Sequence, residues 1–138
     1  MKIVEVAVGV IKCDNKIYIS KRANELHQGG KWEFPGGKRE ANESIEDALV
    51  RELSEEIGIQ VTAQSPFMLI EHDYGDKKVR LDVRLVEGFE GKAHHQEGQQ
   101  SLWVHISDLN KFTFPDANMP IINKLVGLLQ ATINKSEP

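Results

Sequence analysis

The sequence has little cysteine, no excess of positive charge and no long apolar run. Its single cysteine, Cys13, excludes a disulfide framework within the chain of 138 residues and favours a reducing compartment. The N-terminus lacks the apolar stretch of a signal peptide, and no segment approaches the roughly 20 apolar residues of a membrane span. A formal net charge of -4 argues against a nucleic-acid polymer as partner. These absences favour a soluble, cytoplasmic protein.

Length and periodicity predict one compact domain over residues 1–133 and a frayed tail over 134–138. Apolar, β-branched segments predict strands at 3–12, 17–20, 59–72, 79–85 and 102–104. The turn-forming residues 14–16 (Asp-Asn-Lys) allow the first two of these strands to pair as a hairpin. The Ser65-Pro66 pair is expected to interrupt the third strand. A helical pattern at 118–131 predicts a C-terminal helix. Several strands combined with two helices indicate an α/β fold built around a mixed β-sheet.

The other predicted helix, at 44–57, has the clearest pattern. Apolar residues recur four positions apart and form one stripe, at Ile45, Leu49, Leu53 and Ile57. Ser44 is suited to cap the N-terminus of this helix, and Gly58 to end it.

Three glutamates lie on this helix at spacings of i, i+3 and i+4: Glu52, Glu55 and Glu56. Such spacings bring the side chains to one face, where their like charges repel. Glu52 and Glu56 flank the apolar stripe, where a carboxylate is costly unless it is paired or metal-bound. A Mg²⁺ ion, which prefers oxygen ligands, would relieve the repulsion. An acidic surface helix with Arg51 as ion-pair partner is the alternative.

Pro35, Gly36 and Gly37 precede the helix and favour a turn. Glycines allow the backbone to approach a ligand closely, so that a glycine carbonyl can join the carboxylates around a metal. By itself, the same tripeptide is more typical of an ordinary turn from a strand into a loop.

The glycines and glutamates together resemble a complete Nudix box. Gly37 is followed, after five residues, by Glu43 and, after seven more, by Arg-Glu-Leu-Ser-Glu-Glu-Ile-Gly-Ile at 51–59. Further segments resemble the MutT-like subgroup of Nudix hydrolases: Ala7-Val8-Gly9, Arg22-Ala23, 32–38, Phe114-Pro115 and Ala117-Asn118. The resemblance implies a Nudix-type α/β/α sandwich with the mixed sheet between helices.

The resemblance also implies a catalytic machinery. The implied metal ligands are Gly36, Glu52, Glu55, Glu56 and Glu97, holding Mg²⁺ with Mn²⁺ as a substitute. Arg51 would act in catalysis by holding a glutamate through a bidentate pair, with Glu43 as its partner. A metal-bound water would attack phosphorus. Glu52 and Glu97 are alternatives for the base that takes its proton.

Asn118 suggests which base is recognised. Its amide offers one donor and one acceptor, which match the N7–H and the carbonyl at position 6 of 8-oxo-guanine, whereas plain guanine presents an acceptor at N7. Capping of the following helix is the alternative role. The resemblance implies other substrate-binding residues: Arg22, His27, Phe34 and Tyr74.

The implied function is the hydrolysis of 8-oxo-dGTP to 8-oxo-dGMP and pyrophosphate by a monomer, which would sanitise the nucleotide pool and prevent mutation. One alternative is a CTP or 5-methyl-dCTP pyrophosphohydrolase, whose members tend to carry aspartate in place of Asn118. A non-catalytic nucleotide sensor is a weaker alternative, because such modules usually have a degraded box.

Two charged segments are interpreted as solvated surface. Arg80, Asp82 and Arg84 alternate with apolar residues and are expected to form a solvent-facing ladder. His94 and His95 are expected to lie in a solvated loop.

Overall fold

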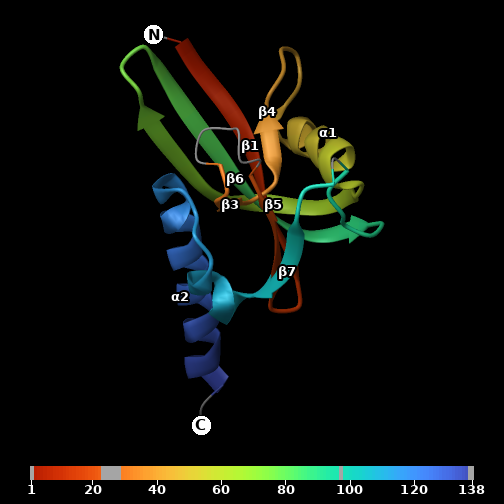
Figure 1. Cartoon of the computed structure of the whole chain (residues 1–138), viewed down its shortest axis with the longest axis vertical. Coiled ribbons are helices and arrows are strands. Elements are labelled where there is room, and N and C mark those ends of the chain that lie inside the picture. The colour runs from red at the N-terminus through yellow and green to blue at the C-terminus, as the bar shows by residue number, and fades with distance from the viewer. Residues whose placement is uncertain (1, 23–28, 97, 137–138) are drawn as a thin grey trace.

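A mixed sheet with one α-helix on each side forms the body of the protein (Figure 1). The computed structural model describes residues 2–22, 29–96 and 98–136. The elements are β1 (Lys2–Cys13), β2 (Lys16–Lys21), β3 (Trp32–Glu33), β4 (Gly36–Lys38), α1 (Ile45–Ile57), β5 (Gln60–Asp73), β6 (Lys77–Glu90), β7 (Ser101–His105), η1 (Ile106–Lys111), η2 (Asp116–Asn118) and α2 (Met119–Ser136). Within these described ranges, neither α-helix has the length and apolar character needed to cross a membrane.

The sheet is organised around β1. Its strand order is β3-β2-β1-β6-β5, while β4 pairs with β1 and β7 pairs with β2. The β1–β6 pair is parallel and extends from Lys2 opposite Lys77 to Ile11 opposite Val86. The other pairs are antiparallel, including the predicted β1–β2 hairpin. The predicted mixed sheet is therefore confirmed.

Alternate side chains of β1 point to different helices. Val8 and Val10 belong to a core cluster that includes Ile121 and Leu125 of α2. Ala7 and Ile11 belong to a second cluster, which contains the buried residues of α1: Ala48, Leu49, Leu53 and Ile57. Since neighbouring residues of a strand face opposite sides of the sheet, the two helices cover opposite faces. The predicted α/β/α sandwich is confirmed.

Both ends of α1 have the predicted caps. The Ser44 hydroxyl accepts a hydrogen bond from the Asp47 N–H at 3.0 Å. Gly58 adopts a left-handed conformation with φ 71°, and its N–H is bonded to the Leu53 and Ser54 carbonyls. These caps fix where the helix starts and stops, and therefore where its glutamates lie along its length.

The prediction that the Ser65-Pro66 pair interrupts a strand is wrong. The strand β5 continues through both residues and pairs with β6 on either side of them. The register of β5 against β6 shifts between Val61 and Ala63, and again between Pro66 and Met68, so that the strand passes the proline without ending. Because β5 lies at an edge of the sheet, the missing N–H of a proline is tolerated there.

The strand β4 and the C-terminal part of α2 also differ from expectation. Gly36 and Gly37, expected to lie in a turn after a strand, begin β4 and pair with Val8 and Ala7 of β1. The helix α2 extends to Ser136, past the predicted end at residue 131. A three-residue strand of two glycines and a lysine has no apolar periodicity, so its pairing depends on the neighbouring strand.

The predicted solvent-facing ladder on β6 is also wrong. Arg84 is buried, donates to the Gln64 side-chain oxygen at 3.0 Å, and lies 3.5 Å from the Glu46 carboxylate at the start of α1. Burial raises the pKa of the Asp82 carboxyl. These side chains face the side of the sheet that α1 covers, since Val86 on the same face packs in the α1 cluster.

Candidate active site

A pocket of about 360 Å³ lies beside α1 and β4. We refer to it as the glutamate pocket; it is lined by Arg22, Glu33, Gly36, Glu52, Glu55, Glu56, His95 and Gln99. The structure thus brings together the three predicted glutamates, Gly36 and Arg22. The side chains of Glu52 and Glu56 are each 20% exposed, whereas that of Glu55 is 65% exposed. This difference matches the predicted position of Glu52 and Glu56 at the edge of the apolar stripe.

The glycines of β4 allow the strand to lie directly against α1. A Cβ atom at Gly37 would come within 2.3 Å of the Glu52 carboxyl carbon. A Cβ atom at Gly36, whose φ is 157°, would come within 2.0 Å of the Ala7 carbonyl oxygen. Real Cβ atoms do not approach other atoms so closely, and the atoms that Gly36 would meet belong to the backbone, so this position requires glycine. At Gly37 the end of the Glu52 side chain would have to move to admit a Cβ atom.

Arg51 connects the loop before α1 to the glutamates. Its Nε and Nη2 donate to the two carboxylate oxygens of Glu43 at 3.1 and 2.7 Å, a bidentate pair. Nη2 also donates to the Lys38 carbonyl at 3.1 Å. Nη1 donates to Glu52 at 2.9 Å and lies 3.5 Å from a Glu55 oxygen. One guanidinium therefore holds four groups from β4, the loop and α1.

The charges in this arrangement stabilise one another. The hydrogen bond from Arg51, and then that from the Glu40 N–H, lower the pKa of Glu43 to about 2. Hydrogen bonding to Glu43 is also the main reason that the pKa of Arg51 is raised. The pair is consequently ionised throughout the neutral range.

Glu56 occupies the other side of the glutamate pocket. It accepts a hydrogen bond from the Gly36 N–H at 3.3 Å, and one of its oxygens lies 3.8 Å from His95 Nε2. The His95 side chain is only 5% exposed, so its predicted place in a solvated loop is wrong. The loop is fixed against the C-terminus of α1, because the Gln96 N–H donates to the Glu56 carbonyl at 2.9 Å. His94, by contrast, is exposed as expected.

Glu33 and Gln99 are lining residues that the sequence reasoning missed. Glu33 forms a 2.7 Å ion pair with Arg22, which lies just after β2. Glu33 lies on β3, and Arg22 directly follows β2. These two strands are antiparallel neighbours, with Ser20 opposite Glu33. Only the pairing of these strands reveals the contact, since the two residues are 11 positions apart and no sequence motif links them.

The family profile described as the NUDIX domain matches residues 6–124. The chain belongs to the NUDIX family. This result confirms the predicted family and hydrolase class, and the likeness to solved structures confirms the fold.

Individual relatives match nearly the whole NUDIX chain. The 8-oxo-dGTP diphosphatase of Escherichia coli strain K12 is 44% identical over 91% of this chain and 98% of its own length. The CTP pyrophosphohydrolase of the same organism is 32% identical over 95% and 97%. A MutT structure from work on Aliivibrio salmonicida and Vibrio cholerae has a TM-score of 0.84 and 43% identity, covering 92% of this chain and 99% of that one.

Among the described residues of this NUDIX domain, the other three predicted to bind substrate do not line the glutamate pocket. Phe34 is buried in the core and stacks on Phe114, with ring centroids 5.2 Å apart. Asn118 ends η2, where its N–H donates to the Pro115 carbonyl. Tyr74 is 56% exposed in the turn between β5 and β6. His27 and Glu97 lie outside the described residues.

The donor set of the glutamate pocket fits a divalent metal ion, the group that Nudix hydrolases generally use. Its carboxylates offer only oxygen ligands, which hard cations prefer. Among the residues that the structure describes, no three acidic, histidine or cysteine side chains converge tightly enough to hold an ion in their present rotamers. Glu52 and Glu55 turn toward Arg51 instead, and Glu56 turns toward Gly36 and His95.

Proposed function

We propose that this Nudix protein is a Mg²⁺-dependent nucleoside triphosphate pyrophosphohydrolase, with Mn²⁺ as a substitute ion. One observation carries the proposal. Glu52, Glu55 and Glu56 line the same pocket as the backbone of Gly36, and Arg51 connects Glu52 to the preceding loop. A polyphosphate chain needs such an arrangement, because carboxylates repel phosphates unless cations lie between them.

Each group of the pocket has a proposed role. Glu52, Glu55, Glu56 and the Gly36 carbonyl would hold the ion, which supplies charge neutralisation of the phosphates and lowers the pKa of a bound water. Glu52 is positioned by Arg51 and is our choice for the base that accepts the proton of the attacking water. Glu97, outside the described residues, is the alternative base and a further candidate ligand. Arg22 would contact the sugar and α-phosphate side of the nucleotide.

We further propose that the preferred substrate is 8-oxo-dGTP, which would be converted to 8-oxo-dGMP and pyrophosphate. The 44% identity to a relative named 8-oxo-dGTP diphosphatase supports this choice. The amide of Asn118 also supports it, because one donor and one acceptor match the oxidised base. His27, Phe34 and Tyr74 remain proposed contributors to nucleotide binding. Removal of oxidised nucleotides from the pool, and hence prevention of mutation, would be the biological consequence.

Hydrolysis of CTP or 5-methyl-dCTP is the second candidate. The relative named CTP pyrophosphohydrolase, at 32% identity, favours it. The two substrates differ in what they present to Asn118, since cytosine has an exocyclic amino donor where 8-oxo-guanine has a carbonyl acceptor. Base preference therefore decides between the two candidates.

A nucleotide screen tests the proposal. Purified protein is incubated with Mg²⁺ or Mn²⁺ and with 8-oxo-dGTP, dGTP, CTP or 5-methyl-dCTP, and the products are separated by anion-exchange chromatography. We expect the highest kcat/KM for 8-oxo-dGTP, with monophosphate and pyrophosphate as products and no turnover in EDTA. A higher kcat/KM for a cytosine nucleotide would show that this nucleotide, and not 8-oxo-dGTP, is the preferred substrate. Turnover that persists in EDTA would refute metal dependence.

A further inference from the structure

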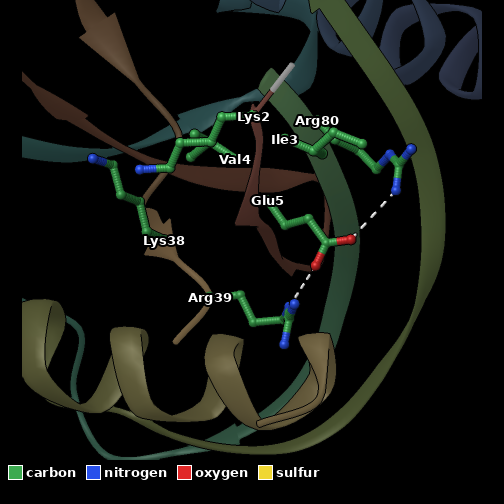
Figure 2. A pocket seen from close by; sticks show the side chains of 7 residues that line it. All are labelled: Lys2, Ile3, Val4, Glu5, Lys38, Arg39 and Arg80. Carbon is green, nitrogen blue, oxygen red and sulfur yellow. Dashed lines mark hydrogen bonds and ion pairs between the residues drawn. The ribbon is translucent and has the colours of Figure 1, made fainter. Parts of the chain in front are cut away.

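A series of contacts between charged residues connects the central strand of the sheet to the glutamate pocket. It begins at Glu5 on β1, whose register partner on the parallel strand β6 is Arg80. Figure 2 shows the Glu5 carboxylate between two guanidiniums, with one oxygen directed to Arg80 and the other to Arg39. The Glu5–Arg80 distance is 3.3 Å. Because both strands belong to the sheet, the sheet holds Glu5 in place, and a side chain that binds Glu5 is held in place as well.

Arg39 connects Glu5 to the loop of residues 39–44, which lies between β4 and α1. Its N–H donates to the Glu5 carbonyl at 2.9 Å, and its Nε donates to the Glu5 carboxylate. Its Nη1 donates to the carbonyls of Glu43 and Glu40, at 2.9 and 3.3 Å. We name these four contacts the Arg39 brace. They hold the main chain of a loop that contains no helix or strand.

The held loop carries the partner of Arg51. Glu43 accepts the Glu40 N–H at 2.7 Å with the same oxygen that binds Arg51 Nη2. Arg51 in turn donates to Glu52 at 2.9 Å. A displacement of the Glu43 main chain would therefore move the Arg51 guanidinium and, with it, the carboxylate of Glu52.

We propose that Arg39 and Glu5 are positioning residues of the active site, which set the place of Arg51 and hence of the Glu52 carboxylate. The proposal rests on the proposed function in assigning Glu52 to metal binding and proton transfer. Neither residue lines the glutamate pocket, so both act through the loop. The alternative is an exposed ion pair that contributes little to the protein, which is common for such pairs.

The first test measures metal binding without nucleotide. Mn²⁺ affinity is determined by electron paramagnetic resonance for the wild type, Arg39→Met and Lys111→Met. Lys111 forms a 3.1 Å surface ion pair with Asp108 in η1 and is a matched control for the loss of a paired cation. We expect Arg39→Met to lose affinity by about tenfold, in the range for groups that orient metal ligands. Lys111→Met should bind like the wild type. Equal affinities in both variants, or no Mn²⁺ binding by the wild type, would overturn the inference.

The second test separates positioning from a loss of stability. With 8-oxo-dGTP, kcat of Arg39→Met should fall by about tenfold while KM stays within about twofold, since no residue of the loop lines the glutamate pocket. Glu5→Gln keeps the side-chain shape and should give a smaller loss, of about threefold, because one carbonyl acceptor remains. Circular dichroism and thermal unfolding establish that each variant is folded. If Arg39→Met fails to fold, Glu5→Gln decides the question; unchanged kcat and Mn²⁺ affinity in it would refute the proposal.

These two tests distinguish the inference from the proposed function. A wild-type protein that binds Mn²⁺ but hydrolyses no nucleoside triphosphate would refute the function, while the Mn²⁺ affinities would still report on the brace. An active wild type with unaffected Arg39→Met and Glu5→Gln variants would leave the function standing and refute the brace.

Discussion

The helices α1 and α2 cover opposite faces of one sheet in different ways. Both bury an apolar stripe: Leu49 and Leu53 of α1 lie in one core cluster, and Ile121 and Leu125 of α2 lie in the other. At the edge of its stripe, however, α1 carries glutamates that meet the glycine strand β4. Among the described residues, α2 contains no acidic side chain.

This difference shows that the site depends on what lies beside a helix as well as on the helix itself. The apolar stripes make both helices part of the fold, since burial of such side chains drives packing. Beside α1, the first two residues of β4 are the glycines Gly36 and Gly37, whose lack of side chains brings the backbone within reach of Glu52 and Glu56. Substitutions that weaken chemistry and substitutions that weaken packing should therefore separate between the two helices.

The largest effect on turnover is expected for Glu52→Gln. The amide preserves the size of the side chain but removes the negative charge and the ability to accept a proton, so kcat should fall by roughly a hundredfold or more. Steady-state hydrolysis of 8-oxo-dGTP measures the change, and circular dichroism serves as the control for folding. Wild-type kcat in this variant would contradict the roles assigned to Glu52.

A smaller loss is expected for Gly37→Ala, which acts from β4. The added methyl group would collide with the Glu52 carboxylate and displace it. A shift of about 1 Å in a reacting group can lower the rate by roughly a hundredfold, and partial relaxation should leave a loss between tenfold and that limit. Gly127→Ala in α2 is the matched control and should leave kcat unchanged, because a Cβ atom at Gly127 meets nothing within 4 Å. Equal kcat in the wild type and Gly37→Ala would show that β4 has no influence on the site.

Asn118→Ala tests selectivity, which we place at the end of η2, directly before α2. The loss of a donor and an acceptor should lower the preference for 8-oxo-dGTP over dGTP by about tenfold, as for one bidentate base contact. The ratio of the two kcat/KM values measures this, and kcat with dGTP should change little. An unchanged ratio would show that Asn118 has no part in base recognition.

Leu125→Ala should have the smallest effect on kcat and a clear effect on stability. Truncation of this buried side chain should lower the free energy of unfolding by about 2–5 kcal/mol. Leu53→Ala, the matched variant in α1, should lower stability similarly and also reduce kcat, because Leu53 adjoins Glu52. Denaturant unfolding and turnover of both variants provide the measurement. A similar fall of kcat in both would show that the two faces are not separate.

Much of the fold could be predicted because its signals are local. The stripe of α1, its Ser44 and Gly58 caps and the β1–β2 turn depend on neighbouring residues, and all three were predicted correctly. The continuous β5 could not be predicted, because whether a proline ends a strand depends on its lying at an edge of the sheet. The predictions of a monomer and of a cytoplasmic location stay untested.

The residues in and around the site also divide into those that a local pattern predicts and those that depend on tertiary contacts. The spacing of Glu52, Glu55 and Glu56 predicted that they share one side of a helix, and they line one pocket. The burial of His95 was missed because it requires the main chain of residues 94 and 96 to bond to the end of α1. Arg84 was assigned to solvent because alternation along a strand does not reveal which helix covers each face.

By itself, the sequence determined the family, the two helices and the set of carboxylates, since each follows from residues within a few turns of one another. The tertiary structure decided how close β4 comes to Glu52, that Arg51 joins the loop to α1, and that Arg39 is bonded to Glu5. Contacts between residues as far apart in the sequence as Glu5 and Arg39 depend on strand order and register, which no local pattern specifies.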